Sequence, residues 1–291
     1  TGILPEQALR MVREEQALLL DVRDAEEIKG GMPEQAEHLA RGQLELNVHN
    51  LAGDTSRPIA VMCAGGLRSL FAAESLLNLG YTKVYSVKGG YKQWKEAALP
   101  VRVPQQLSPR DRERYSRHLL IPEVGEKGQL RLMNSKVLLL GAGGLGSPTA
   151  LYLAAAGIGA LGIVDPDVVE SSNLQRQVIH GEDQLGKLKV DSAAASIGRL
   201  NSAIKVVKHP VMLDENNALE LLQGYDLVVD GSDNFKTRYI VNDACVKLGI
   251  PNVHGAVYRF EGYVTTFAAS DEAPCYRCLY PELPPPEMAP S

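Results

Sequence analysis

The sequence predicts an α/β protein made of two successive domains, each built around a parallel sheet. Short apolar runs of strand length alternate with helical stretches along the chain. A cluster of glycines follows one of these runs at residues 141–146, and prolines and glutamines mark a linker near residue 104. We expect domains over residues 1–104 and 105–291. Hydrophobic side chains make up 45% of the 291 residues, which is enough for two packed cores.

The charge balance excludes one class of function. The formal charge is −5, from 30 basic and 35 acidic residues, and neither domain collects a basic patch. We therefore expect no nucleic-acid binding driven by phosphate neutralisation. Four cysteines and no secretory signal at Thr1 favour a cytoplasmic protein. The uncharged run from Val137 to Val164 could span a bilayer by length, but its seven glycines and one proline favour strand, turn and helix, so no membrane span is expected.

The first domain shows three strand candidates and one clear helix. Apolar runs of strand length predict strands, and an apolar-rich stretch that Gly80 stops predicts the helix. The strands are expected at Leu18–Val22, Ile59–Cys63 and Val84–Val87, with the helix over Leu70–Leu79. Strands that alternate with helices favour a parallel sheet.

The second domain is expected to begin with a capped helix and to continue as a Rossmann-like, doubly wound parallel sheet. Ser108, Pro109 and Asp111 have the spacing of a capping box with proline in the first turn, and the helix carries arginines up to Arg117. Strands are expected at Lys136–Leu140, Leu161–Asp165, Lys205–His209, Asp226–Asp230 and Pro251–His254. The tail Pro281–Ser291 holds five prolines and is expected to be a mobile loop.

Cys63 ends a predicted strand, and Arg68 opens the predicted helix that follows. The glycine-rich loop between them lets backbone N–H groups turn toward the sulfur. A thiolate at such a loop and helix N-terminus is stabilised, so its pKa should fall, and Arg68 adds a positive charge. The same pattern is also typical of a buried structural cysteine before an ordinary turn. The loop alone leaves both interpretations open.

Further motifs resemble the rhodanese family of sulfurtransferases. Besides the cysteine loop, residues 1–104 contain, in order, Asp21-Val-Arg23, Gly89-Gly90-Tyr91 with Trp94, and Leu99-Pro100-Val101. The resemblance implies that Cys63 carries a persulfide, surrounded by the loop amides and Arg68. Four residues separate Cys63 from Arg68, one fewer than in related phosphatases, which suits a sulfur atom rather than a phosphate. The small, uncharged loop Ala64-Gly-Gly-Leu67 leaves the persulfide donor undefined.

The glycine turn of the second domain indicates nucleotide binding. Gly141, Gly143 and Gly146 match the dinucleotide fingerprint, and Asp165 ends the next strand 24 residues after Gly141. This pattern places phosphates at a helix N-terminus and a ribose hydroxyl at the aspartate. Because the motif serves many chemistries, an NAD(P)- or flavin-dependent oxidoreductase is the plain interpretation.

Residues beyond Asp165 favour a triphosphate over a dinucleotide. Backbone amides hold most of a dinucleotide pyrophosphate, whereas a triphosphate needs added cations and Mg²⁺, which takes oxygen ligands such as aspartate. Arg176, Lys189 and Asp233 supply these groups. The alternative is that they are solvated charges on an exposed loop.

The stretch from about Leu107 to Cys278 resembles the MoeB/ThiF family, relatives of ubiquitin-activating enzymes that adenylate sulfur-carrier proteins. The motifs that carry the resemblance are Arg114-Tyr-Ser-Arg117, Gly141–Gly146, Asp165, Asn173–Gln177, Lys189, Asp230–Asn234, Gly255-Ala256 and Cys275-Tyr-Arg-Cys278. By this resemblance Asp165 binds ribose and Asp233 acts near Mg²⁺ and the reacting α-phosphate. It also implies a homodimer in which Arg117 reaches into the partner subunit's site. The residues implied at the ATP phosphates are Gly144, Asn173, Arg176 and Lys189.

Cys275-Tyr-Arg-Cys278 has the spacing of half a zinc site, and equally that of a redox pair. The family carries a second such pair further along, after a loop with a sulfur-handling cysteine. The resemblance thus implies Zn²⁺ on Cys275 and Cys278 with its second ligand pair beyond Ser291, and a chain that lacks its C-terminal part. Cys245, in the helical stretch Ile240–Leu248, is assigned to the core.

The two resemblances together imply ATP-dependent adenylation of the C-terminal Gly-Gly carboxylate of a ubiquitin-like sulfur carrier, followed by persulfide transfer from Cys63 to form a thiocarboxylate. Molybdopterin biosynthesis is the favoured pathway, and thiamine, tRNA thiolation and cysteine pathways use the same chemistry. In most fusions of this kind the rhodanese domain follows the adenylating domain, whereas here it comes first. Two other classes stay open: an NAD(P)-dependent oxidoreductase, and a non-catalytic scaffold with a persulfide-carrying domain.

Overall fold

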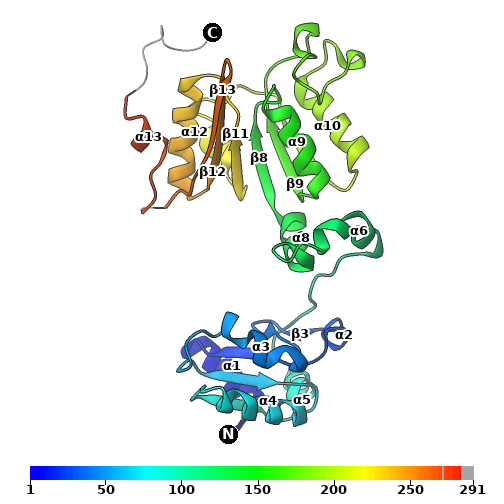
Figure 1. The fold of residues 1–291 in the computed structure, drawn as a ribbon, viewed down its shortest axis with the longest axis vertical. Coiled ribbons are helices and arrows are strands. Elements are labelled where there is room, and N and C mark those ends of the chain that lie inside the picture. Colours follow the sequence, from blue (N-terminus) through cyan, green and yellow to red (C-terminus); the bar gives the residue numbers. More distant parts are fainter. Residues whose placement is uncertain (271, 283–291) are drawn as a thin grey trace. The chain divides into compact units, whose positions relative to one another are not determined.

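The computed structural model describes residues 1–270 and 272–282, and the chain forms two compact units (Figure 1). The units are Thr1–Gln106 and Leu107–Ser291, so the division falls two residues beyond the expected one. Each unit has its own sheet and its own cores. The proline-rich tail lies, from residue 283 on, outside the described residues. Within residues 1–270 and 272–282, no helix combines the length and apolar character needed to cross a membrane.

The first unit is built on a parallel sheet with the strand order β1-β6-β5-β2-β4. The three strands expected from the sequence are β2, β5 and β6, at the centre of this sheet. The edge strands β1 and β4 were not expected, because two residues are too few to show a strand pattern. The strands are β1 (Gly2–Ile3), β2 (Leu18–Asp21), β4 (Glu37–His38), β5 (Ile59–Met62) and β6 (Val84–Val87).

Helices cover both faces of this sheet, because successive side chains of its strands point in opposite directions. Leu20 and Val61 belong to one core with Leu76 of α4 (Leu67–Asn78). Leu19 and Met62 belong to the other core with Trp94 of α5 (Gly90–Glu96). The remaining elements are α1 (Pro5–Glu14), α2 (Ala25–Ile28), α3 (Leu44–Asn47) and the antiparallel pair β3 (Met32–Pro33) and β7 (Val101–Arg102).

The second unit contains a sheet with the order β10-β9-β8-β11-β12-β13. All neighbours are parallel except β13, an edge strand not expected from the sequence, which runs antiparallel to β12. The strand β13 was not predicted because all its residues except Phe267 are at least partly exposed, so the sequence shows no apolar strand pattern there. The strands are β8 (Lys136–Leu140), β9 (Ala160–Val164), β10 (Lys205–His209), β11 (Leu227–Asp230), β12 (Asn252–Tyr258) and β13 (Glu261–Phe267).

This sheet is doubly wound. Val137 and Leu139 of β8 pack in the core that α9 and α10 cover, whereas Leu138 and Leu140 pack in the core under α11 and α12 (Figure 1). The chain therefore changes direction along the sheet between β8 and β11, and ligands of such folds bind at the carboxyl ends of these strands. The helices are α8 (Gly125–Asn134), α9 (Gly146–Ala156), α10 (Lys189–Leu200), α11 (Ala218–Leu222), α12 (Phe235–Leu248) and α13 (Tyr276–Leu279).

The helix expected to begin at Ser108 forms with its predicted cap, but it breaks at Tyr115 into α6 (Pro109–Arg114) and α7 (Ser116–Leu119). The Tyr115 side chain is buried, and its hydroxyl accepts a hydrogen bond from Asn201 at 3.0 Å. Its ring packs so closely on Gly157 that a Cβ there would lie 2.4 Å from the hydroxyl. Tertiary packing of this one aromatic side chain sets the break.

Candidate functional site

Cys63 lies directly after β5, in a loop that closes over its own sulfur. The backbone N–H of Gly66 donates to Sγ at 3.1 Å, and Gly66 takes the left-handed conformation (φ 101°) that this turn requires. The Ser69 hydroxyl lies 3.7 Å from the same sulfur, and the Ser86 hydroxyl lies 2.9 Å from that of Ser69. The side chain of Cys63 is 1% exposed. The loop thus surrounds a buried sulfur with hydrogen-bond donors.

These hydrogen bonds affect the pKa of the Cys63 thiol. Burial alone would raise the pKa of the Cys63 thiol, but hydrogen bonds from the Ser69 side chain and from the amides of Ser69, Gly66 and Gly65 outweigh it, so the pKa lies below its usual value. Cys245 provides a comparison within the same chain. It is also buried, in the core under α12, and burial raises the pKa of its thiol to about 12. Burial is common to both cysteines, and the loop amides distinguish Cys63.

In the part of the chain that the structure describes, Arg68 makes no hydrogen bond to the Cys63 sulfur. Its guanidinium donates to both carboxylate oxygens of Glu27 at 2.7 Å and to Asp24 at 3.3 Å. The hydrogen bond from Arg68 is the main cause that lowers the pKa of Glu27 to about 2. Two carboxylates therefore compensate most of the charge that Arg68 brings to the cysteine loop.

The other motifs of the first unit hold the loop in place. Arg23 and Asp21 form a buried ion pair at 2.7 Å, and the Arg23 guanidinium stacks on the ring of Tyr91 at 3.9 Å. The amide of Tyr91 donates to the Cys63 carbonyl at 2.8 Å. A Cβ on Gly90 would lie 2.1 Å from that carbonyl. The glycine pair before Tyr91 therefore lets α5 begin against the back of the cysteine loop.

The glycine turn of the second unit joins β8 to α9. Gly141 has φ +86°, and a Cβ on Gly146 would lie 1.9 Å from the Gly141 carbonyl, so both positions require glycine. Asp165 follows β9 and is 5% exposed. Its carboxylate accepts hydrogen bonds from the amides of Ala142 at 2.8 Å and Asp167 at 2.9 Å. The acid is thereby fixed beside the turn, where a ribose would lie next to bound phosphates.

Two of the expected cations flank the turn. A Cβ on Gly144 would lie 3.6 Å from the Arg176 side chain, so that arginine lies against the turn, and its guanidinium donates to the Ser172 carbonyl at 3.1 Å. Lys189 starts α10, and its ammonium group pairs with Asp167 at 2.8 Å. Asn173 is buried, and its side-chain oxygen accepts from the Glu170 amide at 3.0 Å. Arg176 thus lies against the glycine turn, while Lys189 is buried and its charge is paired with Asp167.

The turn that carries Asp233 lies beside the glycine turn. A Cβ on Gly141 would lie 3.8 Å from the Gly231 carbonyl, which fixes the two turns as neighbours. Asp233 is exposed and accepts a hydrogen bond from Asn234 at 3.3 Å. Asn234 also caps α12 by accepting from the Thr237 amide at 2.9 Å. An exposed carboxylate thus stands at the edge of the candidate nucleotide site.

Sequence reasoning missed several polar residues beneath this site. His180 is buried between the Ser192 hydroxyl at 2.8 Å and the Ala142 carbonyl at 3.0 Å. Burial lowers the pKa of His180, so a neutral imidazole supports the glycine turn. The side-chain oxygens of Gln177 and Ser232 are buried without a hydrogen-bond partner in the described part of the chain. Unpaired buried oxygens are uncommon, and here they lie where the sequence predicts a ligand.

Arg117 and the cysteine pair lie away from the turn. Arg117 is exposed on α7, as a residue that reaches outward would be. Cys275 and Cys278 are free thiols with sulfurs 3.7 Å apart, close to the ~3.8 Å between two sulfurs on one tetrahedral zinc. In the range that the structure describes, no third histidine, cysteine or acidic residue joins them in a metal-binding group.

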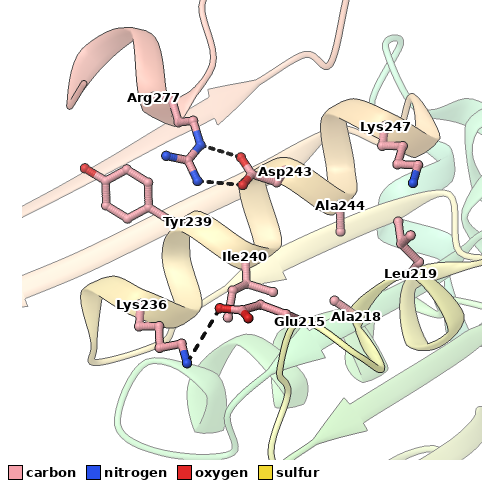
Figure 2. Close-up of a pocket in the computed structure, with 10 residues that line it drawn as sticks. All are labelled: Glu215, Ala218, Leu219, Lys236, Tyr239, Ile240, Asp243, Ala244, Lys247 and Arg277. Carbon is pink, nitrogen blue, oxygen red and sulfur yellow. Dashed lines mark hydrogen bonds and ion pairs between the residues drawn. The ribbon is translucent and has the colours of Figure 1, made fainter. Parts of the chain in front are cut away.

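One surface pocket of the described residues does not coincide with the predicted site residues. It has a volume of about 550 Å³ and lies over α11 and α12. Figure 2 shows that its charged groups are largely paired, Arg277 with Asp243 and Lys236 with Glu215. Its floor is apolar. The chemistry of nucleotide binding points to the glycine turn instead.

Comparison with protein families agrees with this division of the chain. Residues 115–291 match the family model named ThiF family, which is more than half of the chain. The chain belongs to the ThiF family. Residues 4–97 match the rhodanese-like domain, so the ThiF part is preceded by a rhodanese-like unit that contains Cys63.

This ThiF-family chain is similar to several curated proteins. It is 55% identical over 199 residues to the mouse adenylyltransferase and sulfurtransferase MOCS3, covering 66% of this chain and 43% of that protein. It is 55% identical to the probable adenylyltransferase/sulfurtransferase MoeZ of Mycobacterium tuberculosis, covering 64% and 48%. It is 53% identical to the SAMP-activating enzyme E1 of Haloferax volcanii, covering 61% and 65%. The chain spans about half the length of the first two relatives.

Solved structures of similar fold include PaaA and E. coli MccB. The PaaA crystal structure matches 70% of this chain and 62% of its own with a TM-score of 0.54 at 26% identity. The MccB structure matches 65% and 54% with a TM-score of 0.53 at 27% identity.

Proposed function

We propose that this chain uses ATP to adenylate the C-terminal Gly-Gly carboxylate of a ubiquitin-like sulfur-carrier protein. The observation that carries the proposal is the meeting of two turns, at the carboxyl ends of β8 and β11. One turn offers backbone amides, with Arg176 against it and the buried Lys189 paired with Asp167 next to Asp165, and the other offers the Asp233 carboxylate. A dinucleotide needs less positive charge than this, and the names of the MOCS3, MoeZ and SAMP-activating relatives support the same reaction.

In the first stage the carrier carboxylate attacks the α-phosphorus of ATP, and the bond to pyrophosphate breaks. The products are an acyl-adenylate and pyrophosphate. No general base is required, because the nucleophile is already an anion. Arg176 and Lys189 stabilise the charge on the phosphates, while Asp165 orients the ribose. Lys189 is shared between Asp167 and the phosphates, since it pairs with Asp167 in the free chain.

Two metal ions accompany this proposal. Mg²⁺ when bound neutralises phosphate charge, and Asp233 fits it because its carboxylate is exposed at the site. Cys275 and Cys278 fit one half of a tetrahedral zinc site by their sulfur separation, and Zn²⁺ there would fix α13. The second pair of zinc ligands must come from outside the described residues.

In the second stage Cys63 supplies the sulfur. The terminal sulfur of its persulfide attacks the acyl carbon, AMP leaves, and an acyl disulfide to Cys63 forms. A second thiol then attacks the Cys63 sulfur, releasing the carrier thiocarboxylate and leaving Cys63 in a disulfide. Covalent linkage of the two units raises the effective concentration of one site at the other. The lowered pKa of Cys63 supports the sulfur-carrying role.

The same proposal includes the biological setting. Molybdopterin biosynthesis is the pathway we favour. The chain would act as a homodimer in which Arg117 lies near the ATP bound to the partner subunit. A separate protein or small molecule would donate the persulfide sulfur to Cys63. A cytoplasmic location is supported by the four free cysteines.

Pyrophosphate exchange tests the adenylating reaction. Labelled pyrophosphate should enter ATP only when Mg²⁺ and a Gly-Gly carrier are both present, and Arg176→Ala should weaken Mg·ATP binding about 10- to 100-fold in calorimetric titration. Arg199→Ala, on an exposed face of α10, is the matched control and should bind ATP normally. Exchange that ignores the carrier, or NAD(H) binding without ATP binding, would contradict the proposal.

A further inference from the structure

A buried histidine–aspartate pair lies directly behind the Asp233 turn. His254 of β12 is 0% exposed and Asp230 at the end of β11 is 1% exposed, and Nδ1 of the histidine lies 2.9 Å from Oδ2 of the aspartate. The two strands are neighbours in register, with Asp230 opposite His254. Nε2 of the histidine lies 3.1 Å from the Tyr263 hydroxyl on β13. A chain of hydrogen bonds thus crosses three strands.

The chemistry of these groups fixes the direction of the bonds. An ionised carboxylate only accepts hydrogen bonds, so the proton of the imidazole resides on Nδ1 and is donated to Asp230. Nε2 faces the Tyr263 hydroxyl, the second partner of the ring. His254 is enclosed by the rings of Tyr276 at 5.2 Å, Tyr263 at 5.5 Å and Phe267 at 6.5 Å. Because His254 is 0% exposed, it is not placed to contact a substrate directly.

The pair acts on Ser232, the residue before Asp233. Oδ1 of Asp230 accepts the Ser232 amide at 2.9 Å. The Ser232 carbonyl accepts from the buried Arg238 side chain, at 3.2 Å from Nε and 3.0 Å from Nη2. Both backbone groups of Ser232 are therefore held by buried side chains, which restrains the turn that carries the exposed Asp233.

We propose that His254 is a positioning residue: by donating to Asp230 it fixes the turn at residues 231–234 and so the placement of Asp233. The inference rests on the proposed function for its catalytic consequence, because it assumes that Asp233 acts at the reacting phosphate. Removing the Nδ1 donor leaves a buried carboxylate short of one partner. Asp230 then turns toward other donors, and its bond to the Ser232 amide loosens.

Two amide substitutions separate the ends of the imidazole. The side-chain NH₂ of asparagine lies near the Nδ1 position, so His254→Asn keeps a donor to Asp230. The longer glutamine lies near Nε2, so His254→Gln keeps a partner for Tyr263 and loses the donor to Asp230. Tyr263→Phe is the third variant, since it removes only the outer hydrogen bond. All three are measured in the full chain.

The readouts are carrier-dependent pyrophosphate exchange and amide hydrogen exchange. His254→Gln should lower kcat about 10- to 100-fold with KM for ATP changed less than about threefold, because misplacing a group at the reacting centre affects the transition state most. His254→Asn and Tyr263→Phe should stay within about fivefold of wild type. The Ser232 amide should exchange at least about tenfold faster in His254→Gln than in His254→Asn.

The outcomes distinguish this inference from the proposed function. Equal loss of kcat in the Asn and Gln variants, together with equal Ser232 exchange, would overturn the positioning role and indicate a merely structural histidine. If the wild-type chain shows no carrier-dependent exchange, the proposed function fails. The Ser232 amide then still decides whether His254 holds the turn, since that measurement needs no activity.

Discussion

The two units use the same local design, a glycine-rich loop between a strand and a helix, for two different ligands. In the first unit the loop after β5 closes on the chain's own sulfur, and the Gly66 amide already donates to it. In the second unit the loop after β8 donates its Ala142 amide to the Asp165 carboxylate, and no described residue gives the buried side-chain oxygens of Gln177 and Ser232 a hydrogen-bond partner.

This difference shows how much of each site the chain itself completes. The Cys63 sulfur of the first site is part of the protein, and Glu27 and Asp24 compensate the charge of Arg68 beside it. Under the proposed function the second site is completed by the phosphates of ATP, with Arg176 against the turn and Lys189 paired with Asp167 in the free chain. Substitutions at the first loop should therefore affect sulfur transfer and leave ATP use nearly unchanged. Substitutions at the second loop should affect ATP use and leave sulfur loading of Cys63 nearly unchanged.

The largest expected effect follows from removing the sulfur. Incubation with thiosulfate should raise the intact mass of the wild-type chain by roughly 32 Da, the gain of one sulfur as a persulfide. Cys63→Ser should show no gain, while its carrier-dependent pyrophosphate exchange stays at the wild-type level. A mass gain that survives in Cys63→Ser would show that another residue carries the sulfur. Cys245→Ser is the control variant, and it should keep the gain.

A second comparison concerns glycines in and behind the cysteine loop. Gly90→Ala should destabilise the first unit by about 2 kcal/mol or more, because the new Cβ would lie 2.1 Å from the Cys63 carbonyl at a positive φ of 55°. Gly65→Ala in the same loop meets no atom within 4 Å and should change stability by less than about 1 kcal/mol. Urea unfolding of both variants measures this, and equal effects would contradict the close approach of α5.

Ser69 offers a test of the hydrogen bonds that lower the Cys63 pKa. Ser69→Ala removes the strongest of the groups that oppose the burial of the thiol, so the pKa of Cys63 should rise. Below that pKa the reactive thiolate becomes scarcer, so the rate of sulfur loading at neutral pH should fall roughly three- to tenfold and its pH profile should move to higher pH. Ser86→Ala, which contacts Ser69 rather than the sulfur, should move the profile less. An unchanged profile in Ser69→Ala would show that this hydroxyl does not tune the sulfur.

The smallest expected effect concerns the ion pair of Glu27. Because Arg68 lowers the pKa of Glu27 from 4.5 to about 2, the pair stabilises the fold above pH 4.5 and loses this contribution as the pH falls from 4.5 toward 2. The side chains are about one-third exposed, so Glu27→Gln should cost less than about 1 kcal/mol at neutral pH. Urea unfolding from neutral pH to about pH 2 should show the difference from wild type vanish at the acid end. A difference that grows on acidification would contradict the ion pair.

The sequence predicted the parts of the fold that local patterns specify. Central strands such as β5 and β8 are continuous apolar runs, and the capping box at Ser108 is a local signal, so both were predictable. The antiparallel edge strand β13 was not, because its side chains are mostly exposed and its position depends on pairing with β12. The break of the helix at Tyr115 was not predictable for a similar reason, since the Tyr115 ring packs against Gly157, which is distant in the sequence.

The same division holds at the candidate sites. The glycines, Asp165 and Cys63 could be singled out as candidates because backbone geometry or reactive chemistry limits the residue type at those positions. His180 contacts the glycine turn and the His254–Asp230 pair lies behind the Asp233 turn, and only the fold brings these residues together. Spacing in the sequence says nothing about a histidine 38 residues from the carbonyl it holds.

The central claim is that one chain both activates a carrier and gives it sulfur, and the mass of the carrier tests this most directly. With Mg·ATP, a persulfide source and a reducing thiol, a Gly-Gly carrier should gain roughly 16 Da as its terminal carboxylate becomes a thiocarboxylate. Omitting ATP, or using Cys63→Ser, should each abolish the gain. A carrier that stays unmodified with the wild-type chain, or gains sulfur equally with Cys63→Ser, would contradict the account.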